Sequence, residues 1–420
     1  MRYSVDWQDD AENAALEERE TVADLRIWLN ENNVTLHLID GVSVDHLTIS
    51  LYGLAEGLVH DWWNLFGGRD EEVSLVKHRS GYLIPDIRLS FDGSIFEISA
   101  HQRIYRNPEA RFWVGPAEVM TRAQAEGQLD KFVDDVLSRL RERNVAGTSA
   151  ELRWARVRAS RMDADEAAFC EAAGALGLDP YQIDEQSAAL IENAAAHFQG
   201  EPLTEFLAGG GRADKRKLLE WVERVDGRAE DDSLLSQLRS VAEQTASQAP
   251  VSETAESWAL GYRRAKALRR VLNLGSVDRI RSYRKLAEMV GAAKSYELAP
   301  RIDGLRAMRS DHESGIHIHL RDHGTSQYAE SGHLFSFARA VGDAACFPEP
   351  GKAPVNELHF AYRQAAGRAF AAELLAPICE IRAMFEDGYD TVSVAEEFGV
   401  ATNVVERQWE NRSRIENAIP

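Results

Sequence analysis

The stretches FSFARAVGD (residues 335–343) and RAFAAELLAP (residues 368–377) carry most of the information about the fold of the C-terminal part of this chain. Both are rich in small and apolar residues at helical spacing, which predicts two buried helices. The second helix should end at Pro377, because proline cannot continue a helix. Arg339 and Asp343 interrupt the apolar pattern of the first stretch, and a charge in a buried helix needs a partner.

The segments around these two stretches alternate helices with one short strand. We expect helices over residues 256–275 and 276–291, and an edge-type strand at IHIHL (316–320). Downstream, TVSVAEEFGVATNVVERQWENR (391–412) predicts two short helices separated by Gly399.

The N-terminal part has a different pattern. Residues 1–20 are polar and acidic, and we expect them to be frayed or to form a short polar helix. A helix is predicted over residues 54–68, and strands over 34–39 and 46–53. Residues 82–91 and 94–101 alternate apolar with polar side chains around Asp92-Gly93, which predicts a β-hairpin.

The middle of the chain, from about 118 to 250, has mainly helical spacing, and the polar stretch 226–257 is the best candidate for a linker. We therefore expect three domains: an antiparallel α+β domain at 1–117, a helical domain at 118–250 that ends in the linker, and a C-terminal domain at 251–420. The predicted fold class is α+β and mainly helical.

The order of elements after residue 256 resembles the ImmA/IrrE family of zinc metallopeptidases. The resemblance covers roughly residues 256–412, and its best matches are RAFAAELLAP, the frame of FSFARAVGD, and SVAEEFGVATNVVERQWEN (393–411). It implies a zincin-like, mostly helical C-terminal domain with a small sheet. It also implies an HExxH helix, in which two histidines four residues apart hold Zn²⁺ and the glutamate acts as general base.

The positions that the resemblance assigns to zinc chemistry carry other residues in this chain. Arg339 and Asp343 stand in place of the two histidines, Ala340 in place of the glutamate, and Arg363 in place of the acidic ligand of the next helix. Arginine offers no lone pair to a cation, and alanine accepts no proton. We therefore assign no catalytic residue and expect no cofactor.

An ion pair is the simplest use of these replacements. We predict that Arg339 or Arg363 pairs with Asp343 and fills the former metal cavity. The favoured function is then that of a non-catalytic pseudo-metallopeptidase, a regulatory component that binds a protein or peptide partner. The resemblance implies a setting in mobile-element control, stress response, toxin–antitoxin systems or phage defence.

Two alternatives remain. A metallopeptidase with displaced zinc ligands would use the histidine-rich region: His317 and His319 share one face of the predicted strand, and His333 follows. The other interpretation of these histidines is an exposed polar strand face, which the resemblance places at the border of the substrate groove. A DNA-associated regulator would use a helix pair near 163–184 or 393–411.

The bulk composition bears on location and partners. A net charge of −20 opposes nucleic-acid binding by the chain as a whole, because such a surface repels phosphate backbones. The N-terminus has no signal-peptide pattern, and no run of apolar residues is long enough to span a membrane. We expect a cytoplasmic protein without a membrane partner.

Overall fold

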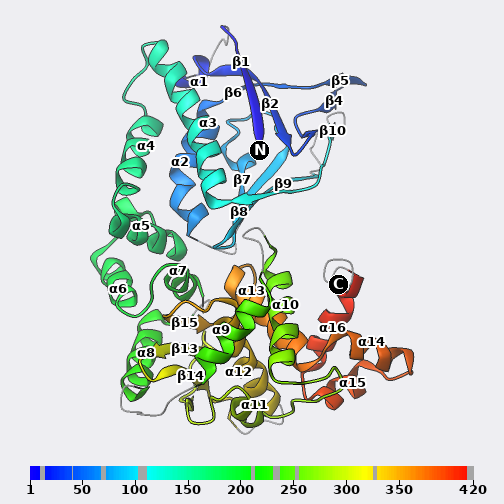
Figure 1. Cartoon of the computed structure of the whole chain (residues 1–420). Helices are drawn as coiled ribbons and strands as arrows, with labels where there is room; N and C mark the ends of the chain where they lie inside the picture. The colour runs from blue at the N-terminus through cyan, green and yellow to red at the C-terminus, as the bar shows by residue number, and fades with distance from the viewer. Residues whose placement is uncertain are drawn as a thin grey trace. The chain divides into compact units, whose positions relative to one another are not determined.

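The computed structural model describes residues 1–9, 15–39, 41–67, 72–102, 111–209, 213–229, 237–250, 255–324 and 329–413 (Figure 1). The fold is mixed α+β, with long helical regions and several small sheets. The chain forms two compact units, Met1–Ile183 and Asp184–Pro420. No helix in the described ranges is long and apolar enough to cross a membrane.

The N-terminal unit combines small antiparallel sheets with five helices among its described residues. Strand β2 pairs with β1, β3 and β6, while β8 and β9 form a hairpin that β7 and β11 extend. A third sheet has the order β10-β4-β5. The elements are β1 (Arg2–Trp7), α1 (Leu16–Arg19), β2 (Val22–Leu29), β3 (Asn32–Asn33), β4 (His37–Ile39), β5 (Val42–Val44), β6 (Leu47–Ser50), α2 (Tyr52–Phe66), β7 (Val73–Ser74), η1 (Leu75–His78), β8 (Asp86–Phe91), β9 (Ile95–His101), β10 (Arg111–Phe112), β11 (Glu118–Thr121), α3 (Arg122–Glu142), α4 (Ser149–Ser160), α5 (Ala164–Leu176) and η2 (Pro180–Gln182).

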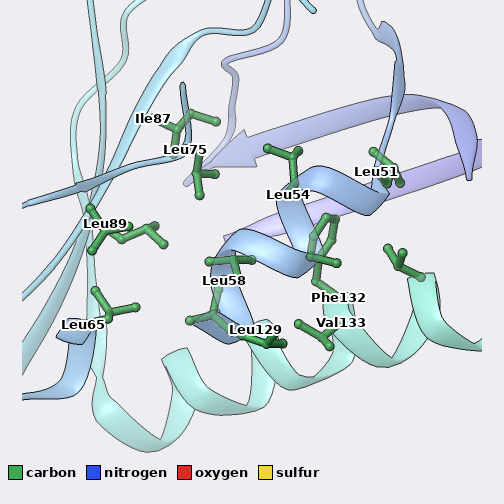
Figure 2. Close-up of a cluster of buried hydrophobic side chains, with 14 of the residues drawn as sticks. Leu51, Leu54, Leu58, Leu65, Leu75, Ile87, Leu89, Leu129, Phe132 and Val133 are labelled. Carbon is green, nitrogen blue, oxygen red and sulfur yellow. The ribbon is translucent and has the colours of Figure 1, made fainter. Parts of the chain in front are cut away.

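Helix α2 is the centre of the hydrophobic core of this unit. Figure 2 shows Leu54 and Leu58 of α2 between Leu89 of the hairpin and Phe132 of α3, and all four side chains are buried. Because the helical spacing of α3 turns its apolar face toward this core, α3 belongs to the N-terminal unit.

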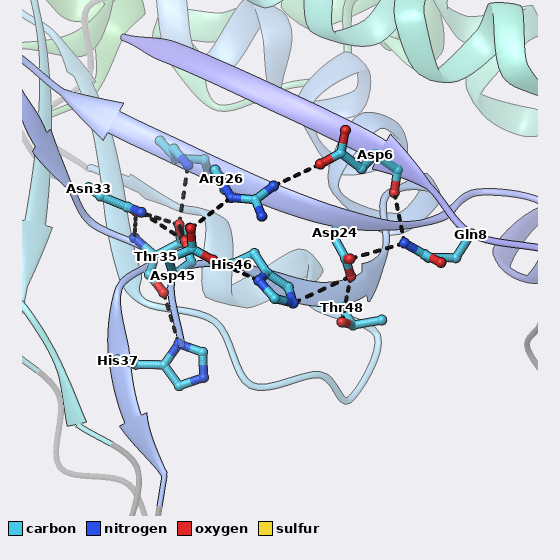
Figure 3. A network of polar contacts seen from close by, with 11 residues as sticks. Asp6, Gln8, Asp24, Arg26, Asn33, Thr35, His37, Asp45, His46 and Thr48 are labelled. Atoms are coloured by element: carbon cyan, nitrogen blue, oxygen red, sulfur yellow. Dashed lines mark hydrogen bonds and ion pairs between the residues drawn. The ribbon is translucent and has the colours of Figure 1, made fainter. Parts of the chain in front are cut away.

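The outer face of the first sheet carries a polar network (Figure 3). Arg26 donates to Asp6 and Asp45, at 2.8 and 3.1 Å, and Asp24 accepts from Thr48 at 2.6 Å. Ion pairs between partly exposed side chains contribute little to the free energy of folding. We therefore regard this network as a polar surface of the sheet and not as a main source of its stability.

The N-terminal predictions have mixed outcomes. The hairpin is confirmed, with Phe91 opposite Phe96 across the Asp92-Gly93 turn. The short polar helix expected within residues 1–20 is present as α1, but residues 2–7 are neither frayed nor helical, since β1 pairs along its whole length with β2. The strand expected at 34–39 is shorter, because Thr35 forms a turn by hydrogen bonding to the Asn33 side chain.

The C-terminal unit is built around one four-stranded sheet of order β12-β14-β13-β15, with helices packed on it. Helices α10, α12 and α13 pack against one another, and α9 contacts both α10 and α12. The elements are α6 (Glu185–Ala195), α7 (Glu201–Ala208), α8 (Lys215–Ala229), α9 (Leu238–Gln248), α10 (Ser257–Val271), α11 (Tyr283–Met289), β12 (Tyr296–Ala299), β13 (Ala307–His312), β14 (Gly315–Arg321), α12 (Ala329–Cys346), β15 (Lys352–Val355), α13 (Tyr362–Leu375), α14 (Ile378–Glu386), α15 (Thr391–Phe398) and α16 (Thr402–Glu410).

The two units divide the chain differently from the three domains expected. The boundary lies between residues 183 and 184, so the helical stretch 118–250 is shared between the units. The linker prediction is wrong for α9, because Leu238 and Ala242 are buried and the helix packs against α10 and α12. Part of the expected linker lies outside the described residues.

Candidate functional site

Helices α12 and α13 approach closely because small residues line their contact. A Cβ atom added to Gly342 of α12 would lie 2.6 Å from Cδ1 of Phe370, and Phe370 of α13 is fully buried. On the other side of α13, a Cβ added to Gly261 of α10 would lie 2.3 Å from the carbonyl oxygen of Ala366. These glycines bring the polar residues of α12 and α13 within reach of one another.

Asp343 is held by two arginines. Nη2 of Arg363 donates to both carboxylate oxygens of Asp343, at 2.9 and 3.0 Å, and Nη1 of Arg309 donates to Oδ2 at 3.0 Å. The predicted contact between Arg363 and Asp343 is therefore present, and Arg309 of β13 adds a partner that the sequence did not indicate. Burial alone would lower the pKa of Arg363, but Asp343 and Glu205 raise it above its ordinary value.

Arg309 completes a network that we call the Asp343 cluster: Asp343, Arg363, Arg309 and Asp311. The side chain of Arg309 is 1% exposed and donates through Nε and Nη2 to Oδ2 of Asp311, at 2.9 and 2.6 Å. It also donates to the carbonyl oxygens of Phe347 and Glu349. A buried ion pair is tolerated only where its remaining donors and acceptors are satisfied, and this cluster meets that condition for Arg309.

Of the two arginines predicted as alternative partners of Asp343, Arg363 takes that role and Arg339 does not. Nη2 of Arg339 donates to the carbonyl oxygen of Asn356 at 2.6 Å and to Oε1 of Gln364 at 2.9 Å. Arg339 is 4% exposed, and its Nε has no hydrogen-bond partner among the described residues. Burial, assisted by the nearby Arg368, lowers the pKa of Arg339 to about 9. Ala340 beside it is fully buried.

A buried glutamate connects α7 to this region. Nε2 of Gln364 donates to Glu205 Oε2 at 2.7 Å, and the Asn356 side chain donates to the Glu205 carbonyl oxygen at 3.0 Å. Burial raises the pKa of Glu205 to about 8, despite the opposing effect of Arg363. Sequence reasoning had no signal for Glu205, because it lies far upstream on a separate helix.

An open cavity of about 900 Å³ lies beside Arg339, and we call it the arginine groove. Its walls come from α10, α12, α13, α16 and the segment after β15. Four arginines and one acidic residue, Glu357, are among its lining residues, together with aromatic side chains from three segments. The lining residues are Trp258, Tyr262, Arg306, His323, Ser331, Gly332, Phe335, Ser336, Arg339, Glu357, His359, Phe360, Arg368, Ala369, Ala372, Ala401, Asn403, Val404, Arg407, Gln408 and Asn411.

The charged groups at one end of the groove are held in place by hydrogen bonds and ion pairs with the segment after β15. Nε of Arg306 donates to Oε1 of Glu357 at 2.6 Å, and the same oxygen lies 3.8 Å from Nη1 of Arg339. Arg368 donates to the carbonyl oxygens of Leu358 and His359, at 2.6 and 2.7 Å. This end of the groove is therefore a fixed set of guanidinium groups with one carboxylate among them.

The histidines proposed as displaced ligands lie in two places. His317 and His319 share one face of β14, as predicted, but the interpretation as exposed polar surface is wrong because both are buried. The reason is that β14 is paired on both sides, by β12 and β13, so it is no edge strand. Nδ1 of His319 lies 3.2 Å from Oε1 of Glu297. His333 instead contacts His323, whose backbone N–H donates to His333 Nε2.

These histidines form no recognisable metal centre. Within the described ranges, no group of three or more histidine, cysteine, aspartate or glutamate side chains is placed to hold a metal ion. The site therefore brings together Arg339, Ala340, Asp343 and Arg363 at the contact of α12 with α13, but leaves His317, His319 and His333 apart from a common ligand set.

Comparison with known proteins adds no relative. No protein-family model matches the chain, and neither a curated protein nor a solved structure matches it significantly.

Proposed function

We propose that this chain is a non-catalytic recognition protein, in which the C-terminal unit keeps the frame of a zinc-peptidase domain and binds a peptide segment of a partner in the arginine groove. The observation that carries the proposal is the engagement of Asp343 by Arg363 and Arg309. Asp343, at the position that the resemblance assigns to the second histidine, already has two cationic partners, while an open groove lies beside the α12–α13 contact.

Zinc does not fit the residues at these positions. A zinc site needs lone pairs from histidine, cysteine or carboxylate side chains, and the guanidinium groups of Arg339 and Arg363 supply only donors and positive charge. Asp343 would have to leave two arginines to bind a cation that those arginines repel. Ala340, at the position of the general base, has no group that accepts a proton.

The alternatives receive less support. A displaced-ligand metallopeptidase would need His317 and His319 to reach a water-filled cleft, and both lie buried in the central strand of the sheet. A DNA-associated regulator would need a basic reading surface, which the net charge of −20 opposes. The regulatory settings named above follow from the resemblance alone and are part of the proposal.

The arginine groove suits a peptide by its size and lining. A volume of about 900 Å³ is at the upper end of ordinary ligand sites. Trp258, Tyr262 and Phe335 offer apolar contact area, and the arginines offer donors that fix the orientation of a bound chain. Phe360, on the same lining, is 65% exposed and has the character of an interaction anchor.

A synthetic octapeptide library tests the proposal. We expect the full-length protein to retain a subset of peptides, to release them uncleaved as judged by mass spectrometry, and to lose them when Ala372→Trp fills the groove. Met162→Trp, at an exposed position in the N-terminal unit, is the matched control and should retain the same peptides. Zinc-dependent cleavage of the peptides, or retention unaffected by Ala372→Trp, would contradict the proposal.

A further inference from the structure

We infer that the arginine groove recognises an acidic peptide, and that one ligand carboxylate displaces Glu357 from Arg306 and Arg339. This inference rests on the proposed function and names the chemical class of its ligand. It comes from three features of one end of the groove: a buried arginine that lines it, a set of arginines around that residue, and a resident carboxylate that is half exposed.

The first feature is Arg339 itself. Its side chain is 4% exposed and lines the groove, and its Nη1 lies 3.8 Å from Oε1 of Glu357. A buried guanidinium has lost the water that would solvate its charge, so an anionic partner stabilises it. A carboxylate from the ligand that takes the place of Glu357 beside Nη1 supplies such a partner through a charge-assisted hydrogen bond.

The second feature is the charge of the groove. Among its described lining residues, Arg306, Arg339, Arg368 and Arg407 outnumber the acidic Glu357. The chain as a whole carries −20, so this excess of positive charge is local and runs against the charge of the molecule. A local field of this kind selects an anionic ligand.

The third feature is Glu357, whose carboxylate already shows how an acid is held there. Oε1 accepts from Nε of Arg306 at 2.6 Å and lies 3.8 Å from Nη1 of Arg339. The side chain of Glu357 is 54% exposed, and an ion pair with an exposed partner is easily exchanged. A ligand carboxylate takes over these donors while Glu357 turns into solvent.

A peptide fits these features better than a nucleic acid. A polynucleotide carries a phosphate at every residue and meets the repulsion of the whole acidic chain. A peptide, by contrast, can bring a single acidic side chain to Arg339. The apolar residues next to that side chain in the peptide would then pack on Tyr262 and Phe335.

The test uses the full-length protein and fluorescein-labelled octapeptide pools in which one central position is fixed as Glu or as Gln. We expect the Glu pool to bind about tenfold more tightly than the Gln pool, the gain of one charge-assisted contact. Arg306→Gln should remove this preference, and Glu357→Gln should strengthen Glu-pool binding roughly threefold to tenfold, because the internal competitor is gone. Arg382→Gln, an exposed arginine outside the groove lining, is the control and should change neither.

The outcomes separate the two proposals. Equal binding of the Glu and Gln pools, together with loss of both in Ala372→Trp, would overturn the acidic-ligand inference and leave the peptide-binding function standing. Absence of binding by every pool would overturn both. Displacement of the Glu pool by a labelled oligothymidylate at physiological salt would also overturn the inference, since the groove would then favour a nucleic acid.

Discussion

At the scale of single residues, Asp343 is the position whose loss should cost most. Asp343→Ala deprives the buried Arg309 and the 12% exposed Arg363 of their shared carboxylate, and removing one partner of a buried ion pair costs about 3–5 kcal/mol. Arg309 keeps Asp311, so we expect the lower end of this range. The measurement is urea unfolding of the full-length chain, followed by circular dichroism.

Two further variants make the Asp343 prediction specific. Asp343→Asn keeps hydrogen-bond acceptance without the charge and should lose less stability than Asp343→Ala. Glu386→Ala removes an exposed acid from a 3.8 Å contact with Arg382 and should stay within about 0.5 kcal/mol of the unmodified protein. Asp343→Ala with unchanged stability would mean that the cluster is not a buried network.

Glu205 gives a pH dependence with a defined sign. Its pKa is raised to about 8 by burial, so between about pH 4.5 and pH 8 the folded chain keeps a proton that the unfolded chain has released. Raising the pH through this window therefore destabilises the fold. Glu205→Gln has no proton to lose, so its stability relative to the unmodified protein should grow from pH 5 to pH 8 by a few kcal/mol, since one pKa unit is about 1.4 kcal/mol.

Thermal unfolding of Glu205→Gln at several pH values measures this difference. Glu192→Gln, at an exposed position on α6, is the matched control and should follow the unmodified protein at every pH. A Glu205→Gln curve parallel to that of the unmodified protein from pH 5 to pH 8 would contradict a raised pKa for Glu205.

At the scale of secondary-structure elements, the contact of α12 with α13 depends on one glycine. A Cβ at Gly342 would overlap the buried ring of Phe370, so Gly342→Ala should destabilise the protein by about 1–3 kcal/mol. Gly367→Ala, on the facing helix, places its Cβ 3.5 Å from the carbonyl oxygen of Arg339, an ordinary contact. It should be neutral or stabilising by up to about 1 kcal/mol. Equal stability of the two variants in urea unfolding would show that Gly342 sets no close approach.

Elements that carry a local signal could be predicted from the sequence, and those that depend on distant partners could not. The Asp92-Gly93 turn and the apolar periodicity of α12 and α13 are local, and all three were found. Strand β1 was missed although it alternates polar residues with Tyr3, Val5 and Trp7, because the composition of residues 1–20 as a whole is polar and acidic. The pairing of Arg363 with Asp343 could be predicted because the family resemblance places both residues at the same site. Arg309 and Glu205 reach that site from elements that no sequence spacing connects to it.

At the scale of the whole molecule, the excess of acidic residues opposes a nucleic acid as partner. With a net charge of −20, the chain repels a polyanion at long range, and the helix pairs near 163–184 and 393–411 are short. We expect no saturable binding of a fluorescein-labelled 20-base-pair DNA duplex at roughly physiological salt, about 0.15 M, by fluorescence anisotropy. Lowering the salt should not produce binding, because unscreened repulsion grows as ions are removed. Saturable binding that weakens steeply as salt is added would instead reveal a basic face and restore the DNA-associated alternative. Comparing Arg407→Glu in α16 with Arg156→Glu in α4 would then show which of the two helices contributes to the DNA-binding face.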